Sequence, residues 1–372
     1  MSGRIGILQQ NAKIFISQSQ NIFENLAFEE WLLRNYRPDE ENESMFIWSN
    51  KPAVVIGRHQ NPWLEADLNY LKSNNIELAR RHSGGGAVYH DLGNLNISVL
   101  TSHQRHKRRR NLLMIAEALN QEFNIKVEPN DRDDLWLQPG RRKISGTAAR
   151  IVRQLAYHHL TLLVNVDVAV LKRSLSSPFR ETMLTNATRS VQAPAIGCLA
   201  HEIPDITVEK AQNVVMDSFK RQYLHTEVIT LSNVMNDQQF PGVLEYEKEL
   251  RNWEWIYGRT PQFTLPLYND RIRVEHGVIT GSLKNQKLVG SRLPQDVIQT
   301  YLGFAVKPIL GTDTTKYLAE LKAYLCEIPK GYDPKLIAIN ATVVAALFGA
   351  LIYPFYVYLI GDNTVTGKKQ TL

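Results

Sequence analysis

Cysteine is scarce in this sequence, with Cys198 and Cys326 the only two among 372 residues. Two thiols cannot build a disulfide framework or a multi-thiolate metal site, so the composition indicates a reducing compartment. Cys198 lies in the apolar segment AIGCLA, where a free thiol is usually inert, which argues against a thioester-forming nucleophile. His158 and His159 are neighbours on an expected strand and point to opposite faces, so they cannot easily chelate one ion. We expect no metal site.

Other absences narrow the class of protein. The first 23 residues have no long apolar core, which argues against a secretory signal. With 44% hydrophobic and 22% charged residues, the composition is that of a globular protein, and the length allows two domains. Part of the net charge of +6 comes from the run RHKRRR at 105–110. No nucleic-acid module surrounds this run, so we interpret it as a solvated loop before a helix or a basic rim for an acidic acceptor domain. We expect no nucleic-acid partner.

The spacing of apolar residues predicts a mixed α+β fold. Helical spacing occurs over residues 23–33, 111–123 and 207–223. Alternating or short apolar runs predict strands over 46–48, 53–56, 76–79, 96–101, 125–127, 134–137, 143–148 and 155–166. Tight turns rather than regular crossover helices separate most of these strands, which argues against a doubly wound parallel sheet. We assign residues 1–240 to this first domain.

The character of the chain changes after residue 240. Residues 241–335 predict a small α+β accessory domain with a Trp-rich segment (252–258), a hairpin turn at His276-Gly277, and helices over 294–304 and 312–325. Residues 336–360 carry no charge. At ~1.5 Å per residue a helix of this length exceeds the ~30 Å apolar core of a bilayer. We therefore expect a C-terminal apolar helix and a candidate transmembrane anchor at 336–360, followed by a polar tail at 361–372. A buried helix is the alternative.

The densest chemical signal is LARRHSGGGAVYHDLGNLN at 78–96. Consecutive glycines after a strand let the backbone approach a ligand closely, and successive N–H groups in such a loop bind anions. Arg80 and Arg81 could add charge-assisted bonds to a phosphate. The segment matches neither the Walker pattern nor the dinucleotide fingerprint. It suits an adenylate, although a bare triple glycine can also be a simple turn.

The segment RRKISGTAAR at 141–150 supplies a second signal. Lys143 leads an alternating strand, and Gly146 keeps the backbone accessible. An ammonium group beside an acyl-phosphate anhydride can neutralise the phosphate and stabilise the oxyanion that develops on the carbonyl. A surface lysine beside two arginines is the alternative. A third segment, VVIGRHQNPW at 54–63, ends a strand in polar groups that could line a pocket.

Together these segments resemble the lipoyltransferase and lipoate–protein ligase A family. The resemblance is carried by VVIGRHQNPW, LARRHSGGGAVYHDLGNLN, DRDDLWL, KISGTA, YHHLTLL, TNAT and WEWIYG, which follow in the family's order over residues 20–330. It implies a catalytic domain of the biotin/lipoate protein ligase type and a small C-terminal domain. The apolar segment at 336–360 departs from this pattern, since family members are ordinarily soluble.

The resemblance also implies roles for individual residues. Lys143 would be the catalytic residue and would contact the anhydride at the reacting carbonyl. The residues that bind lipoyl-AMP would be Arg81, Gly84, Gly85, Gly86, Ala87, Val88, Tyr89, Arg132, Lys143, Thr161, Thr185 and Ala187, with His59, Gln60 and Asn61 near the acyl chain.

The implied activity is transfer of a lipoyl group from lipoyl-AMP to a specific lysine of apo lipoyl domains. These acceptors would be the acyltransferase subunits of 2-oxo-acid dehydrogenase complexes and the glycine cleavage H protein. The motifs run closest to the animal form, which implies a mitochondrial location. A complete ligase that uses lipoate, ATP and Mg²⁺ stays open as an alternative. A biotin ligase is disfavoured because its Gly-Arg-Gly-Arg loop is missing. A non-catalytic, membrane-tethered adaptor for lipoyl domains is disfavoured by Lys143 beside an intact glycine loop.

Overall fold

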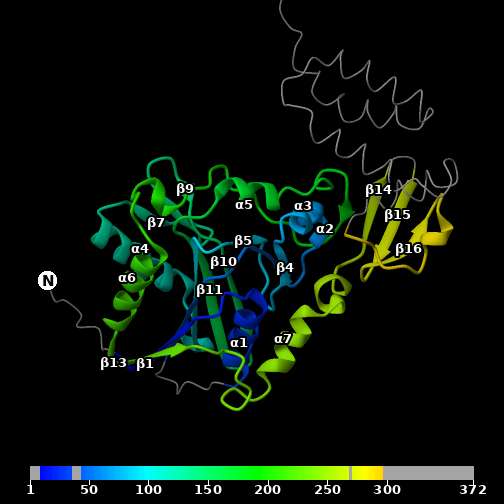
Figure 1. The fold of residues 1–372 in the computed structure, drawn as a ribbon. Helices are drawn as coiled ribbons and strands as arrows, with labels where there is room; N and C mark the ends of the chain where they lie inside the picture. The colour runs from blue at the N-terminus through cyan, green and yellow to red at the C-terminus, as the bar shows by residue number, and fades with distance from the viewer. Residues whose placement is uncertain (1–8, 36–42, 268–269, 296–372) are drawn as a thin grey trace, which may run out of the picture. The chain divides into compact units, whose positions relative to one another are not determined.

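A six-stranded sheet is central to the part of the chain that the computed structural model describes, residues 9–35, 43–267 and 270–295 (Figure 1). Its strand order is β10–β11–β6–β2–β1–β13. Neighbouring strands are antiparallel from β10 to β2, whereas β1 runs parallel to both β2 and β13. The strands are β1 (Gln9–Ser17), β2 (Glu43–Trp48), β6 (Asn94–Ser102), β10 (Thr147–Val152), β11 (Leu155–Leu163) and β13 (Tyr223–Leu231).

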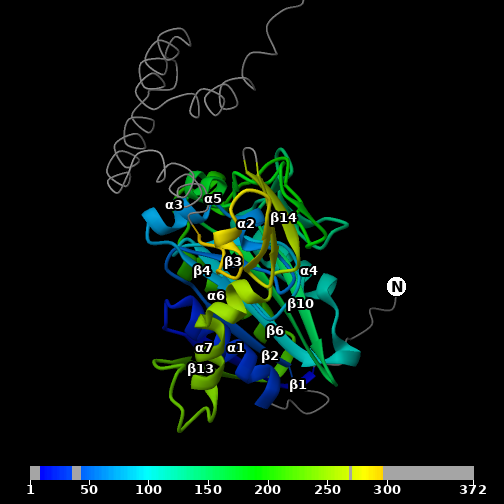
Figure 2. The ribbon, with the colours of Figure 1, turned by 90° about the vertical axis from the view of Figure 1, so that its right-hand side faces the viewer.

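Helices cover both faces of this sheet. On β11, His159 contacts Glu29 of α1 (Ile22–Asn35), and its neighbour His158 contacts Asn111 of α4 (Arg108–Phe123). Because successive strand residues point to opposite faces, α1 and α4 lie on opposite sides of the sheet. Helix α6 (Val208–Lys220) packs beside α4 (Figures 1 and 2). The two histidines therefore diverge, as their spacing predicts.

A smaller sheet lies on the α1 side, in the order β4–β3–β5. Its strands are β3 (Ala53–Ile56), β4 (Glu77–Arg80) and β5 (Val88–His90). Every residue of β3 is buried, which is why its sequence is the uninterrupted apolar run AVVI. Two short helices, α2 (Pro62–Glu65) and α3 (Leu68–Ser73), connect β3 to β4. The glycine cluster connects β4 to β5, which places it at one end of this sheet.

Two further sheets complete the described residues. One is β7 (Val127–Pro129), β8 (Leu135–Leu137) and β9 (Arg142–Lys143), and the other has the order β12–β14–β15–β16. The latter strands are β12 (Leu184–Thr185), β14 (Phe263–Leu267), β15 (Asp270–Glu275) and β16 (Val278–Ser282). His276 (φ 50°) and Gly277 (φ 72°) form the β15–β16 turn. Positive φ at both central residues is typical of a type I′ hairpin, so the predicted hairpin is confirmed. The remaining helices are α5 (Val168–Ser174), α7 (Val243–Arg251) and the π-helical turn η3 (Glu254–Gly258).

The sequence predictions and the structure differ in several places. The strand expected at 143–148 is two strands, because β9 ends at Lys143 and β10 begins at Thr147. The helix expected at 207–223 ends at Lys220, and Tyr223 already begins β13. Strands β1 and β13 were not predicted at all, although they pair with each other over most of their length. Both alternate only in part, so their sequences lack a clean period of two.

The basic run at 105–110 is not simply a solvated loop. Arg110 and Arg105 pair with the buried Glu43 at 2.8 and 3.3 Å, and Arg108 pairs with Asp133 at 2.9 Å. These contacts attach the first turn of α4 and the residues just before it to the first residue of β2 and to the loop before β8. Much of the charge in the run is therefore used within the molecule.

The predictions for the C-terminal part lie largely outside the described residues. This applies to most of the helix at 294–304, to the helix at 312–325, to the apolar segment at 336–360 and to the tail at 361–372. Within the ranges that the structure describes, no helix is both long and apolar enough to cross a membrane. The domain boundaries after residues 240 and 335 stay predictions.

Candidate functional site

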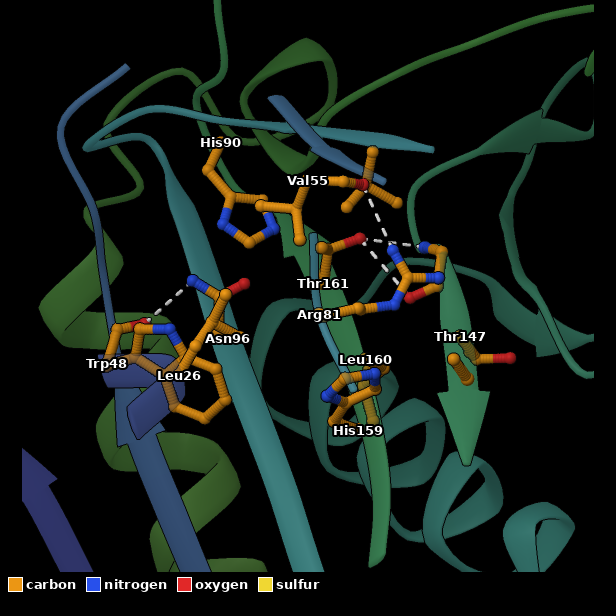
Figure 3. Close-up of a pocket in the computed structure, with 13 residues that line it drawn as sticks. Leu26, Trp48, Val55, Arg81, His90, Asn96, Thr147, His159, Leu160 and Thr161 are labelled. Atoms are coloured by element: carbon orange, nitrogen blue, oxygen red, sulfur yellow. Dashed lines mark hydrogen bonds between the residues drawn. The ribbon is translucent and has the colours of Figure 1, made fainter. Parts of the chain in front are cut away.

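Two cavities meet at Val88, Gly146 and Thr161, which line both of them. The first lies between α1, the β4–β3–β5 sheet and the six-stranded sheet, and its empty space of about 370 Å³ includes space that is open to solvent (Figure 3). The second encloses about 660 Å³, including space that is open to solvent. A side chain on Gly146 would place its Cβ 2.8 Å from Val88 Cγ1. Glycine at this position therefore avoids a clash with Val88 where the two cavities share their lining.

The first cavity, which we call the acyl cavity, has apolar walls from Leu26, Trp48, Val55 and Leu160. A few polar side chains interrupt these walls. Among them His159 is held at both ring nitrogens, with Nε2 2.9 Å from Ser83 Oγ and Nδ1 2.9 Å from Glu29 Oε1. The apolar walls thus suit an apolar chain. The His159 ring cannot rotate, because both of its nitrogens are held by hydrogen bonds. The polar lining residues are Arg81, His90, Asn96, Thr147, His159 and Thr161.

Arg81 holds the glycine loop rather than reaching out of it. Its guanidinium donates to the carbonyl oxygens of Gly84 (2.6 Å), Gly86 (2.8 Å) and Val55 (3.0 Å), and to Ser83 Oγ (2.9 Å). Burial lowers its pKa to about 10, so it stays charged at neutral pH. Four of its five N–H donors therefore fix the loop, and the expected direct phosphate contact stays a prediction.

Arg80 is used in the same way. It donates to the carbonyl oxygens of Gln60 (2.7 Å) and Ile256 (2.6 Å) and to Thr260 Oγ1 (3.1 Å), and so attaches the loop after β3 to η3. Burial lowers its pKa to about 9. A Cβ on Gly57 in the same loop would lie 2.3 Å from the Gly85 carbonyl oxygen. The loop after β3 therefore supports the glycine loop by direct backbone contact, and Arg80 makes no bond toward either cavity.

The second cavity, which we call the nucleotide cavity, contains Lys143. Its Nζ lies 2.8 Å from Asp134 Oδ1. The backbone of Lys143 is held on both sides, because it pairs with Trp136 of β8 and donates to the Ala195 carbonyl at 2.9 Å. Gly197 donates back to the Lys143 carbonyl at 3.0 Å. A cation is thus fixed in the wall of the nucleotide cavity.

Ser190 is a lining residue that sequence reasoning missed. Its Oγ accepts hydrogen bonds from Ala87 N (2.7 Å) and Gln60 Nε2 (3.0 Å). Its backbone N–H donates to the buried carboxylate of Glu65 at 3.1 Å. No local pattern marks this serine, because its partners are far away in the chain. It joins the glycine loop to the segment that forms the outer wall of the nucleotide cavity.

Cys198 lines neither cavity. The side chain is buried, and this burial raises the pKa of its thiol. A raised pKa reduces the thiolate fraction, which supports the expectation of an inert cysteine. In the described ranges, no group of three or more His, Cys, Asp or Glu side chains is placed to hold a metal ion.

Comparison with known families agrees with this geometry. Residues 21–220 match the lipoyl protein ligase A/B catalytic domain, which covers the six-stranded sheet except for β1 and β13, together with both cavities. The chain belongs to this family.

Curated members of the lipoyl ligase family are similar to the chain over most of its length. The mitochondrial lipoyl amidotransferase of Homo sapiens is 41% identical over 257 residues, which is 69% of this chain and 68% of the relative. A lipoate-protein ligase A of Bdellovibrio bacteriovorus is 33% identical over 343 residues, covering 86% of this chain and 98% of the relative.

Solved structures show the same lipoate-ligase fold. The P. falciparum protein LipL1 in complex with lipoate superposes with a TM-score of 0.58 at 24% identity, covering 85% of this chain and all of that one. A lipoate-protein ligase A bound with ATP gives a TM-score of 0.54 at 23% identity, covering 66% of this chain and 98% of that one. The mixed α+β class expected for the catalytic domain is confirmed.

The structure brings only some of the family-implied residues to the cavities. The residues that line them are Arg81, Ala87, Val88, Tyr89, Lys143 and Thr161. Gly84, Gly85 and Gly86 form the loop that Arg81 holds. The others line neither cavity: His59 and Arg132 are exposed, Gln60 and Asn61 are buried in loop contacts, and Thr185 and Ala187 lie on or beside β12, which pairs with β14.

Proposed function

We propose that the chain transfers a lipoyl group from lipoyl-AMP to a lysine of a lipoyl domain. The observation that carries this proposal is the junction at Val88, Gly146 and Thr161, with an apolar cavity on one side and a cavity containing Lys143 on the other. An acyl-adenylate has the same division, because an apolar chain and a nucleotide meet at one mixed anhydride. The family match and the lipoyl-transferring relatives support the same activity.

The chemistry of the step needs little from the protein beyond position and charge. The neutral ε-amine of the acceptor lysine attacks the acyl carbon, a C–N amide bond forms, the C–O bond to phosphate breaks, and AMP leaves with the electron pair. The amine loses one proton to solvent. Lys143 beside the junction would stabilise both the developing oxyanion and the leaving phosphate. Arg81 holds the carbonyl oxygens of Gly84 and Gly86, so the N–H groups of the glycine loop would add fixed donors, apart from that of Ala87, which already donates to Ser190 Oγ.

The proposed acceptors are the apo lipoyl domains of 2-oxo-acid dehydrogenase acyltransferase subunits and the glycine cleavage H protein. A bi-partite lipoate protein ligase of Thermoplasma acidophilum, studied with its E2 lipoyl domain, shares the fold with a TM-score of 0.55 at 24% identity. The human and mouse relatives are mitochondrial proteins, at 41% and 42% identity, and we place this chain in the mitochondrion on that basis.

Two other donors compete with lipoyl-AMP. The Bdellovibrio relative is a lipoate-protein ligase A, which favours a complete reaction from lipoate, ATP and Mg²⁺. The human relative is named an amidotransferase, which favours a donor that is already lipoylated on a protein. In that case the bond that breaks is the amide bond of the donor protein. Its leaving group, the lysine amine, is much poorer than AMP.

A three-tube experiment distinguishes these donors. The full chain is mixed with an apo lipoyl domain and lipoyl-AMP, or lipoate with ATP and Mg²⁺, or a lipoylated H protein, and the acceptor is followed by intact mass spectrometry. We expect modification with lipoyl-AMP. Modification with lipoate and ATP as well identifies a complete ligase, and modification by the H protein alone identifies an amide donor. No modification in any tube by folded protein overturns the proposal and favours a non-catalytic adaptor.

A further inference from the structure

A chain of buried hydrogen bonds connects α1 to the glycine loop through β11. Glu29 Oε1 lies 2.9 Å from His159 Nδ1, and His159 Nε2 lies 2.9 Å from Ser83 Oγ. Arg81 Nε donates to the same Ser83 oxygen at 2.9 Å. All four side chains are buried, and Ser83 is only 1% exposed. We call this set the Glu29–His159–Ser83–Arg81 relay.

The chemistry of the four groups gives the relay one direction. A guanidinium can only donate, and an ionised carboxylate can only accept. Ser83 Oγ therefore accepts from Arg81 Nε, and His159 Nδ1 donates to Glu29. In a neutral imidazole that carries its proton on Nδ1, Nε2 accepts, so it receives a hydrogen bond from the Ser83 hydroxyl. Each group thus holds the next, and hydrogen bonds in such a chain polarise one another.

Serine, histidine and glutamate at these distances are also the nucleophile, base and carboxylate of serine hydrolases. A nucleophile must meet its acyl carbon. Ser83, however, is buried and lines neither the acyl cavity nor the nucleotide cavity. Its oxygen is already in contact with both Arg81 and His159. The burial of Ser83 therefore favours a positioning role over a nucleophilic one.

The relay ends at the peptide groups of the glycine loop. Arg81 Nη2 donates to the carbonyl oxygens of Gly84 (2.6 Å) and Gly86 (2.8 Å). A trans peptide is planar, so its C=O and N–H groups point in opposite directions. Because the Gly84 oxygen is held toward Arg81, the Gly85 N–H is turned away from it. The direction of this donor depends on where the guanidinium lies, and Ser83 holds the guanidinium at Nε.

We infer that Glu29 and His159 are positioning residues for lipoyl transfer, which fix the N–H donors of the glycine loop through Ser83. This inference rests on the proposed function, because it takes these donors to act on the phosphate of lipoyl-AMP. Donors aimed at developing charge affect the transition state more than the binding of the donor molecule. A displacement of about 1 Å at a reacting centre can cost about 10²-fold in rate, so a smaller tilt of the loop should cost about tenfold.

The first test interrupts the relay at two places in the full chain. Ser83→Ala and Glu29→Leu should each lower the single-turnover rate from saturating lipoyl-AMP by about tenfold. The affinity for a non-hydrolysable lipoyl-sulfamoyl-adenosine analogue should change by less than about threefold, because the relay acts on the transition state. Both changes act through one chain of contacts, so the double variant should be no slower than the slower single variant.

Two further variants separate positioning from general loss of packing. Glu29→Gln keeps an oxygen that accepts from His159, so it should retain the transfer rate to within about threefold. Ser44→Ala is the matched control for Ser83→Ala. Ser44 is equally buried, at 1% exposure, and lines the same small cavity as Glu29. Its hydroxyl has no hydrogen-bond partner among the described residues, so its removal should leave the rate unchanged.

A nuclear magnetic resonance signal reports the position of the loop independently of transfer. Carbonyl-¹³C serine and ¹⁵N glycine labels select the amide of a glycine that follows serine, which occurs at Gly3, Gly84 and Gly146. The Gly84→Ala variant assigns the loop signal by removing it. This signal should shift in Glu29→Leu, although the two positions are far apart in the sequence. It should stay in place in Glu29→Gln and in Ser44→Ala.

Three results would overturn the inference. The first is a normal transfer rate in folded Ser83→Ala and Glu29→Leu, and the second is a Gly84 signal that does not move in Glu29→Leu. The third is a covalent lipoyl adduct that the unmodified chain forms from lipoyl-AMP without acceptor and that Ser83→Ala does not form, which would make Ser83 a nucleophile. His159→Phe interrupts the relay in its middle and takes the place of Glu29→Leu if that variant does not fold. If the unmodified chain transfers no lipoyl group, the proposed function fails, and the Gly84 signal alone decides the inference.

Discussion

The ammonium nitrogen of Lys143 lies 2.8 Å from Oδ1 of Asp134, and both side chains are only partly exposed, at 27% and 13%. The two residues are on β9 and immediately before β8, two strands that pair directly. The carboxylate therefore holds the cation in one place in the lining of the nucleotide cavity. This ion pair gives the proposed mechanism its most direct tests.

Replacing Lys143 by alanine should lower the rate of lipoyl transfer by about 10²–10³-fold, because a fixed cation near the developing oxyanion is lost. The fold should persist, since the side chain is not part of the core. Single-turnover transfer from lipoyl-AMP measures the rate, and circular dichroism measures whether the variant is folded. Lys126→Ala is the matched control, because Lys126 lies just before β7 of the same small sheet and is 71% exposed. Near-normal transfer by folded Lys143→Ala would remove this residue from the mechanism.

Asp134→Asn should lower kcat by about tenfold with little change in KM, because Lys143 keeps its charge but loses its fixed position. Asp134 acts through Lys143, so the two effects should not add. In the Lys143→Ala background, Asp134→Asn should change the rate by less than about twofold. The measurement is a double-mutant cycle on single-turnover rates. Additive losses would show that Asp134 contributes independently of Lys143.

Two glycines near the loop should respond differently to alanine. A Cβ on Gly57 would lie 2.3 Å from the backbone oxygen of Gly85, and backbone cannot move aside cheaply. Gly57→Ala should therefore lower the free energy of unfolding by about 1–3 kcal/mol. A Cβ on Gly84 would meet no described atom within 4 Å, so Gly84→Ala should stay within about 0.5 kcal/mol of the parent. Urea denaturation compares the two variants, and equal destabilisation would contradict the packing argument.

The buried histidines predict loss of stability in acid. Burial lowers the pKa of His90 and His158 to about 3, whereas an unfolded histidine has a pKa of about 6.5. Their contribution is fully present above pH 6.5 or so and is lost as the pH falls toward about 3, because only the unfolded chain takes up the protons. Between neutral pH and pH 5, each histidine should lower the free energy of unfolding by about 2 kcal/mol.

Urea denaturation between pH 7.5 and 5 measures this slope. His158→Asn keeps an acceptor for Asn111 but removes one titrating ring, so the acid-dependent loss should fall by about half. Substitution of the exposed His225 by asparagine serves as the control. If His158→Asn has the same pH dependence as the parent, burial of His158 does not determine acid sensitivity.

The elements predicted correctly are those that depend on a pattern of neighbouring residues. The buried run AVVI forms β3 over the residues expected, and the apolar stripe at 111–123 lies within α4. The turn at His276-Gly277 also forms as its residue types require. In each case the chain's own periodicity or turn chemistry agrees with the final environment. Strands β1 and β13 lack such a pattern of neighbouring residues. For β13 the reason is that most of it faces solvent at the edge of the sheet.

The sequence by itself determined the family, the glycine loop and Lys143, because these depend on residue types at short spacing. Only the tertiary structure decided what the buried polar groups do. It directs Arg80 and Arg81 into loop carbonyls, and it brings Ser190 to Ala87 from a distant part of the chain. It also leaves His90 Nε2 at the acyl cavity without a hydrogen-bond partner among the described residues. The physical reason is that a buried hydrogen bond depends on which distant atoms lie within about 3 Å, and no local pattern of residues specifies that distance.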